Sequence, residues 1–333
     1  MGLIAFFGVA DHERPVLERA AFGANPVLLS TEQLSPENAA RVPEAEVLSV
    51  FIYSRVTADV LARLPGLKLV TTRSTGFDHI DVAACRQRGI LVSNVPSYGE
   101  STVAEHAFAL LFALARRLKL AYRKVRDLDF SFTGLQGFDL ADKTLGIVGA
   151  GRIGRHAIRM GRGFGMRVLA YDPFEDPAAA AREGFTYVAL DDLLRESHVV
   201  SLHAALTDGT LHLIDREALR KMRPDAVLIN TARGGLVDTE ALCEALQGGR
   251  IGGAGLDVFE GEDLISEEAE LLHRPLTVAQ MKSLLLVHAL LRHDNVVLTP
   301  HTAFFTREGV GRLLDTGIDN IRGYLAGTPC NLV

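Results

Sequence analysis

Short apolar segments alternate with longer stretches of helical periodicity along this chain. The first series of apolar segments lies at residues 3–7, 48–53, 69–72 and 90–93. The second series lies at residues 144–149, 167–171, 198–202, 226–230, 253–258 and 295–298. Each segment is apolar across its middle without polar alternation, as is typical of parallel strands that helices cover on both faces. The pattern predicts an α/β protein with two series of parallel strands.

A long helix is expected between the two series. Thr102 and Glu105 have the spacing of a capping box, in which the two side chains bind each other's backbone N–H groups at the start of a helix. An apolar stretch without Gly or Pro then continues to about Leu118. A chain of 333 residues also suits two domains better than one, so we place a domain boundary near the start of this helix.

Charge and composition exclude several functions. The 35 Lys and Arg residues against 41 Asp and Glu give a net charge of −6, which leaves no broad basic surface for nucleic acid. The longest apolar runs fall short of the roughly 18 residues that span a bilayer, so no membrane association is expected. The spacing of Cys85, Cys243 and Cys330 fits neither a disulfide framework nor a metal site, which favours the cytoplasm. Metal motifs such as H-E-x-x-H are absent, and no metal is expected.

A glycine-rich turn follows the first strand of the second series. Gly149 permits a tight turn, Gly151 lets the backbone approach a pyrophosphate, and Gly154 lets helix and strand pack closely. Asp172 ends the next strand, where a carboxylate can accept hydrogen bonds from a ribose diol and repel a 2′-phosphate. The spacing predicts a dinucleotide site that prefers NAD. The alternative for Asp172 is a helix cap or a turn before Pro173.

Three later strands are each followed by a polar side chain. Arg233, Glu262 and His301 come after the strands at 226–230, 253–258 and 295–298, and the carboxyl ends of parallel strands bind ligands in such sheets. The planar fork of an arginine suits a carboxylate. A histidine can donate a proton as hydride transfer builds charge on a carbonyl oxygen, and a neighbouring glutamate stabilises its charged form. Beside a nicotinamide, this set predicts the reduction of a 2-keto acid.

Each of these residues also has an ordinary structural interpretation. A histidine after a strand is often a turn residue, and an arginine there can pair with a surface carboxylate. Glu262 begins an acidic stretch of the kind found on solvated faces, which continues with Asp263, Glu267, Glu268 and Glu270.

Eight short motifs occur in one order along nearly the whole chain. They are R-S-T-G-F-D-H-I-D from residue 73, N-V-P-S-Y from 94, T-V-A-E-H-A from 102, G-A-G-R-I-G from 149, Y-D-P-F from 171, N-T-A-R-G-G-L-V-D from 230, G-L-D-V-F-E-G-E from 255 and T-P-H-T-A-F from 299. With these motifs the chain resembles the D-isomer-specific 2-hydroxyacid dehydrogenases, and within them the D-lactate dehydrogenase branch.

The resemblance implies roles for individual residues. Arg233, Glu262 and His301 match the family's catalytic arginine, glutamate and proton-donating histidine. The substrate carboxylate is expected to meet Arg233 and the backbone N–H groups of Thr75 and Gly76, with Tyr98 lining the pocket. Besides the three glycines and Asp172, NAD is expected to contact Arg152, Ile153, Ala204, Ala205, Thr210, Thr231, Ala232 and Asp257.

The resemblance also implies the domain organisation. It predicts two Rossmann-like or flavodoxin-like domains with parallel sheets, the cofactor domain being inserted into the substrate domain. Residues 1–99 and 302–333 would form the discontinuous substrate domain, and residues 100–301 the NAD-binding Rossmann domain. A homodimer is expected, with the helix at Thr102 in its contact. The segment 267–291 is longer than expected and has the pattern of an amphipathic helix, which covers either the site or a subunit contact.

The expected function is NAD-dependent reduction of a 2-keto acid to a D-2-hydroxy acid, with pyruvate and D-lactate as the first candidates. Alternative substrates in the same fold are a bulkier 2-keto acid, the pair of hydroxypyruvate and glycerate, and phosphite. A corepressor-like protein that senses NAD without catalysis is an alternative of another class, and a Rossmann-like methyltransferase is a third. The methyltransferase would not require Arg233, Glu262 and His301 together.

Overall fold

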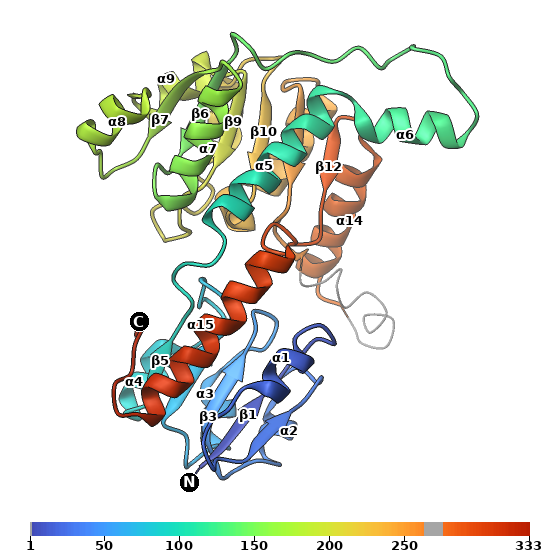
Figure 1. Ribbon diagram of the computed structural model, residues 1–333. Coiled ribbons are helices and arrows are strands. Elements are labelled where there is room, and N and C mark those ends of the chain that lie inside the picture. The colour runs from blue at the N-terminus through green and yellow to red at the C-terminus, as the bar shows by residue number, and fades with distance from the viewer. Residues whose placement is uncertain (1, 263–275) are drawn as a thin grey trace. The chain divides into compact units, whose positions relative to one another are not determined.

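The computed structural model describes residues 2–262 and 276–333 (Figure 1). The chain forms two compact units, one made of Met1–Gly99 with Phe305–Val333 and the other of Glu100–Phe304. Both sheets are parallel, as the unbroken apolar segments predict. None of the helices in the described part of the chain combines the length and hydropathy that crossing a membrane requires.

The first unit contains a five-stranded sheet in the order β2-β1-β3-β4-β5. Its strands are β1 (Leu3–Phe6), β2 (Val27–Leu29), β3 (Ala45–Val50), β4 (Leu69–Thr72) and β5 (Leu91–Ser93). Its helices are α1 (Arg14–Arg19), α2 (Pro36–Ala39), α3 (Ala58–Ala62), α4 (Val82–Gln87) and α15 (Arg307–Leu325). The C-terminal helix α15, red in Figure 1, packs against α1 and β4. Both ends of the chain therefore build this unit.

The second unit contains a seven-stranded sheet in the order β12-β11-β10-β9-β6-β7-β8. Its strands are β6 (Thr144–Val148), β7 (Arg167–Tyr171), β8 (Thr186–Tyr187), β9 (Val199–Leu202), β10 (Val227–Asn230), β11 (Gly253–Leu256) and β12 (Val296–Leu298). From β6 the order runs one way through β7 and β8, and β9 returns to the other side of β6. A ligand crevice is expected at such a switch point, beyond the carboxyl ends of the strands.

Helices cover both faces of the larger sheet. One buried cluster joins the sheet to α5 (Glu100–Ala115), α7 (Arg152–Gly163) and α8 (Pro177–Glu183). The other joins it to α9 (Leu190–Glu196), α10 (Arg216–Lys221), α11 (Thr239–Gln247) and α14 (Val278–Arg292). Burial on both faces explains why the strands lack polar alternation.

The helix between the two series of strands differs from its prediction at both ends. It begins at Glu100, so Thr102 is already helical and buried, and the predicted capping box is wrong because a cap residue lies outside the helix. It ends at Ala115 rather than Leu118, because the Ala115 carbonyl accepts from the Phe138 N–H (3.0 Å) and Arg117 adopts a left-handed φ of 52°. A separate helix, α6 (Leu118–Arg126), follows.

Part of the long segment before His301 is helical. α14 begins after a capping box formed by Thr277 and Gln280 and extends to Arg292. The acidic run from Asp263 to Glu270 and the rest of the expected helix up to residue 275 lie outside the described residues.

Candidate active site

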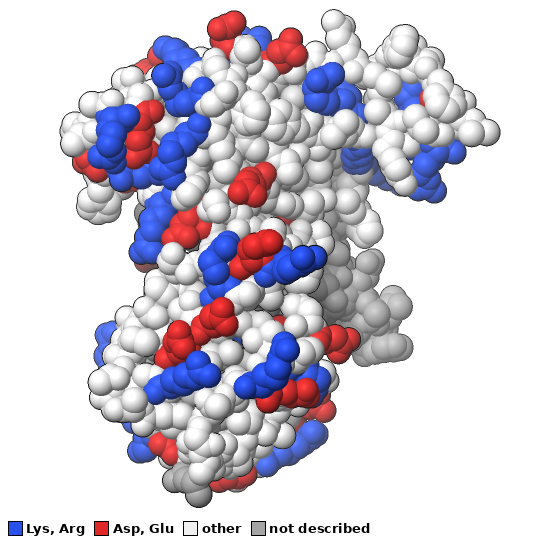
Figure 2. Space-filling view, in the orientation of Figure 1, with Lys and Arg blue, Asp and Glu red and all other residues white. Residues whose placement is uncertain are grey.

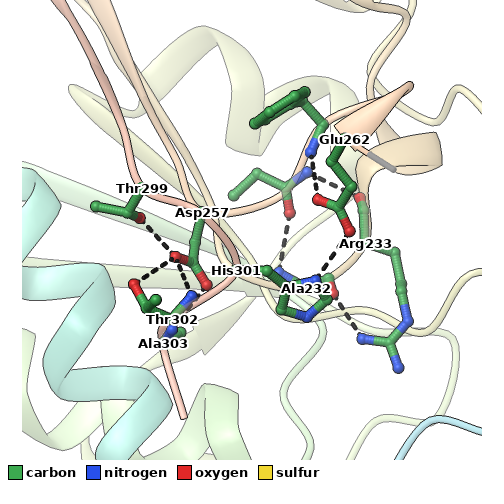
Figure 3. Close-up of polar contacts among 10 residues, drawn as sticks. Ala232, Arg233, Asp257, Glu262, Thr299, His301, Thr302 and Ala303 are labelled. Atoms are coloured by element: carbon green, nitrogen blue, oxygen red, sulfur yellow. Dashed lines mark hydrogen bonds and ion pairs between the residues drawn. The ribbon is translucent and has the colours of Figure 1, made fainter. Parts of the chain in front are cut away.

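Loops after three adjacent strands carry the predicted catalytic residues. Arg233 follows β10, Glu262 follows β11 and His301 follows β12. These strands are parallel neighbours, so their carboxyl ends lie at one edge of the sheet. Figure 3 shows the three side chains within one close-up of this edge.

Glu262 and His301 form a direct pair. The His301 Nδ1 atom lies 2.8 Å from Glu262 Oε1, and the two side chains are 22% and 25% exposed. The second carboxylate oxygen of Glu262 accepts a hydrogen bond from the Phe259 N–H (3.2 Å). Because the Glu262 carboxylate can only accept a hydrogen bond, the network assigns a proton to His301 Nδ1 and leaves Nε2 as the second ring nitrogen.

Arg233 lies on a turn that is held by the buried Asn230. The Asn230 side chain donates to the Arg233 carbonyl (2.8 Å) and accepts from the Ala232 N–H (3.0 Å), and Arg233 Nη1 donates to the Ala232 carbonyl (2.7 Å). Gly234 is required here, because a Cβ atom would overlap the backbone of Phe259. The Arg233 turn thus packs on the loop that leads to Glu262.

Asp257 is buried between these loops. Its carboxylate accepts hydrogen bonds from the Thr299 hydroxyl (2.5 Å) and from the backbone N–H groups of Thr302 (2.9 Å) and Ala303 (2.8 Å). Burial by itself raises the pKa of this carboxyl, but the hydrogen bonds from His106, Thr299 and the backbone outweigh it, so the pKa is lowered. Asp257 is therefore an ionised anchor inside the fold.

The predicted glycine turn connects β6 to α7. Gly149 has φ +95°, which favours glycine, and a Cβ atom there would lie 2.6 Å from the Ala204 backbone nitrogen. A Cβ atom at Gly154 would overlap the Gly149 carbonyl. Gly151, the residue before the helix, faces open space, and Arg152 and Ile153 form the first helical positions. The turn therefore leaves room in front of the amino end of α7, where a phosphate is stabilised.

Asp172 bridges the glycine turn and the end of β7. Its carboxylate accepts from the Ala150 N–H (2.8 Å) and from the Phe174 N–H (2.9 Å). It caps no helix, because Asp176 is the cap of α8. Each carboxylate oxygen retains a second acceptor position, as a ribose diol requires.

The other predicted cofactor residues follow β9 and β10. Ala204, Ala205 and Thr210 come after β9, and Thr231 and Ala232 come after β10. Of the six buried side-chain atoms without a hydrogen-bond partner among the described residues, two lie here, the hydroxyl of Thr231 and the Nδ1 atom of His203. Buried polar groups are normally paired, so these atoms and the space at Gly151 fit a bound dinucleotide. His203 was not predicted, although it directly follows β9.

Thr75, Gly76 and Tyr98 belong to the first unit. Thr75 and Gly76 follow β4, where the Thr75 hydroxyl donates to the Val95 carbonyl (2.7 Å) and the Asn94 side chain donates to the Thr75 carbonyl (2.7 Å). Ser74 donates to the Gly76 carbonyl (2.6 Å). The Tyr98 carbonyl accepts from Arg312 Nε (2.5 Å). The turn at Thr75 is therefore fixed by its own unit.

Known proteins match this arrangement. The family model of the D-isomer specific 2-hydroxyacid dehydrogenase, NAD binding domain, matches residues 108–303 of this chain. The D-lactate dehydrogenase of Escherichia coli strain K12 is 36% identical over 301 residues, 89% of this chain and 88% of that protein. The glyoxylate reductase of Korarchaeum cryptofilum is 39% identical over 298 residues, 88% of this chain and 84% of that protein.

A solved structure agrees over nearly the whole length. The crystal structure of the Aquifex aeolicus D-lactate dehydrogenase, complexed with NAD and lactic acid, has a TM-score of 0.88 at 36% identity and covers 98% of this chain and 96% of that one. The chain therefore belongs to the D-isomer-specific 2-hydroxyacid dehydrogenase family, resembles its D-lactate dehydrogenase branch, and is a dehydrogenase with NAD as its cofactor.

Proposed function

We propose that the protein reduces a 2-keto acid to the D-2-hydroxy acid, with pyruvate as the first candidate substrate. The observation that carries this proposal is the pair of His301 and Glu262, 2.8 Å apart, at the same sheet edge as Arg233. A proton donor, its stabilising carboxylate and a carboxylate-binding cation are the groups that carbonyl reduction needs.

The three residues take separate parts in the reaction. Bound NADH supplies the hydride. Arg233 holds the substrate carboxylate and polarises the carbonyl oxygen on which negative charge develops. His301 gives its Nε2 proton to that oxygen, which completes the hydroxyl group, and Glu262 stabilises the imidazolium form that must precede this transfer. In the reverse direction, neutral His301 takes the hydroxyl proton.

The two units have different proposed tasks. Residues 100–301 hold NAD through the glycine turn, Asp172 and the loops after β9 and β10. Residues 1–99 and 302–333 bind the substrate through the backbone N–H groups of Thr75 and Gly76, with Tyr98 in the pocket. Within the described residues, neither of these N–H groups donates a hydrogen bond, as a carboxylate site requires. Asp172 makes NAD preferred over NADP.

A substrate panel tests the proposed reaction. NADH oxidation is followed with pyruvate, hydroxypyruvate, glyoxylate and a branched 2-keto acid, and the product of each is assayed for its D isomer. Replacing His301 by Gln should lower kcat by roughly two to four powers of ten, the usual contribution of a general acid. An unchanged kcat would overturn the role of His301. Tight NADH binding without turnover of any acid would favour the NAD-sensing alternative.

We further propose a homodimer that uses α6 and the segment after it, residues 127–135, together with α5. Figure 1 shows α6 and this segment extending beyond the larger sheet. In Figure 2 the same region shows mainly uncharged residues, and most of the charged residues seen there are Lys and Arg. Large apolar side chains there are exposed, including Leu128 (81%), Phe130 (72%) and Phe132 (90%). Exposed apolar clusters of this kind mark protein contacts. Light scattering of a Phe130→Ser, Phe132→Ser double variant should show the monomer.

A cytoplasmic location completes the proposal. The three cysteines are all free, and Cys85 and Cys243 are buried thiols whose pKa values burial raises to about 11. Unpaired cysteines suit a reducing compartment. Acidic and basic residues are interspersed over the face seen in Figure 2, so this face carries no broad basic surface of the kind that nucleic acid requires.

A further inference from the structure

The backbone of the loop that carries His301 depends on one buried carboxylate. Asp257 accepts hydrogen bonds from the N–H groups of Thr302 and Ala303, the two residues after His301. The Asp257 backbone carbonyl also accepts from the His301 N–H (2.9 Å). Thr299, two residues before His301, donates its hydroxyl hydrogen to the same carboxylate. Asp257 therefore holds the loop on both sides of His301.

His301 needs this support because its backbone is strained. Its φ of +53° lies in the left-handed region, which is unfavourable for a residue other than glycine and persists only where surrounding contacts enforce it. The direction of the imidazole ring toward Glu262 follows from this backbone conformation. If the loop relaxed to an ordinary φ, the ring would point elsewhere.

His106 extends the support to the long helix α5. Its Nε2 atom lies 3.0 Å from the Thr299 hydroxyl oxygen and 3.3 Å from Asp257 Oδ1. Thr299 has one hydroxyl hydrogen and donates it to Asp257, so the oxygen accepts from His106. His106 thus links a helix packed on the sheet to the carboxylate of Asp257, both through Thr299 and by its own contact with Asp257 Oδ1.

We propose that His106 is a positioning residue for the reaction, which acts through Thr299 and Asp257 to fix the loop that presents the His301 ring. The inference rests on the proposed function of His301. His106 contacts neither the His301 ring nor the Arg233 guanidinium in any of the contacts described above, so it acts through other groups. The hydrogen bonds from Thr299, Thr302 and Ala303 engage both carboxylate oxygens of Asp257. They give Asp257 a role besides the cofactor contact that the family resemblance implies.

Two variants of His106 separate positioning from simple packing. His106→Leu removes the donor, whereas His106→Gln retains a side-chain N–H that can reach Thr299. We expect His106→Leu to lower kcat roughly 10- to 100-fold, because a displacement of about 1 Å at a reacting group costs that much. The Kd for NADH, measured by its fluorescence, should stay within about threefold, and His106→Gln should recover most of the activity. Asp192→Asn, an exposed change in the same unit and outside the proposed dimer contact, is the control.

Hydrogen exchange supplies a readout that does not depend on turnover. In His106→Leu, the amides of Thr302 and Ala303 should exchange faster while the strands of the sheet keep their protection. Unchanged kcat with unchanged exchange at 299–304 would overturn the proposal, and so would faster exchange throughout the unit. If His106→Leu does not fold, Thr299→Val removes the part of the link that runs through Thr299 and takes its place. A wild-type enzyme that reduces no 2-keto acid would refute the proposed function, whereas the exchange data would still decide the role of His106.

Discussion

Replacing Glu13 by Gln should strongly destabilise the first unit. The guanidinium of Arg73 is 1% exposed, and Glu13, whose side chain is 8% exposed, is its carboxylate partner at 3.1 Å. Arg73 also donates to Ser49 Oγ (3.2 Å) and to the carbonyls of Phe7 (3.0 Å) and Gly8 (3.1 Å). These contacts link the carboxyl ends of β1, β3 and β4. Glutamine has nearly the shape of Glu13 but leaves the buried positive charge without a counter-charge.

The expected cost follows from the contacts. Glu13 accepts two hydrogen bonds from Arg73, at 3.1 and 3.4 Å, and charge-assisted bonds contribute about 1.5–3 kcal/mol each. Removing one partner of a buried ion pair costs about 3–5 kcal/mol, which agrees with that sum. At about 1.4 kcal/mol for each tenfold change, the unfolded fraction should rise by roughly two to nearly four powers of ten.

Urea unfolding measured by circular dichroism tests this value, since the chain contains no tryptophan for fluorescence. Hydrogen exchange of peptides from β3 and β4 assigns the loss to the first unit. The control is Asp192→Asn, which breaks an exposed pair with Arg195, at 57% and 53% exposure, and should change the stability by less than about 1 kcal/mol. A loss below about 1 kcal/mol in Glu13→Gln would refute the reasoning.

Three further predictions concern the second unit. Glu262→Gln should lower kcat/KM for keto-acid reduction about tenfold or more, because the charged form of the His301 imidazole loses its carboxylate partner; steady-state kinetics with pyruvate measure this loss. Asp172→Ser should lower the kcat/KM ratio of NADH to NADPH about tenfold or more, because repulsion of the 2′-phosphate is lost; an unchanged ratio would reduce Asp172 to a turn residue. Burial lowers the pKa of His203 to about 4, so its contribution to stability is present above the unfolded value of about 6.5 and is lost as the pH falls toward 4. His203→Gln should flatten the unfolding free energy over that pH range.

Strand positions were predictable where an apolar segment is buried, and less so where a strand is short and exposed. The segment predicted at 69–72 coincides with β4, and that at 167–171 with β7. β2 was not predicted because it has only three residues, and two of them, Val27 and Leu28, are exposed. β8 was not predicted because it has only two residues. The segment predicted at 48–53 lies three residues beyond β3, Ala45–Val50, because the apolar residues Phe51 and Tyr53 follow the strand. The hydrophobic pattern reports burial, and β2 and β8 have little of it.

The candidate site was predictable as far as strand ends determine it. Arg233, Glu262 and His301 follow adjacent parallel strands, which a topological rule brings to one edge. The link between His106 and Thr299 joins residues 193 positions apart in the chain. The T-V-A-E-H-A motif that contains His106 gave no indication that Thr299 is its partner. Such contacts depend on how α5 packs on the sheet, which periodicity does not specify. The left-handed backbone of His301 was not predicted either, because non-glycine residues adopt it uncommonly even though histidine is among those enriched there.

The participation of both ends of the chain in the first unit has a consequence for folding during synthesis. Residues near the C-terminus complete its sheet edge, where the Val333 N–H donates to the Val92 carbonyl (3.0 Å) and the Asn94 N–H donates to the Asn331 carbonyl (3.1 Å). Domains generally fold as the ribosome releases them. The first unit is therefore complete only when residues 305–333 have been synthesised, whereas residues 100–304 are released before them and can fold in the meantime. Until then, β5 offers an unpaired edge of the kind that chaperones protect.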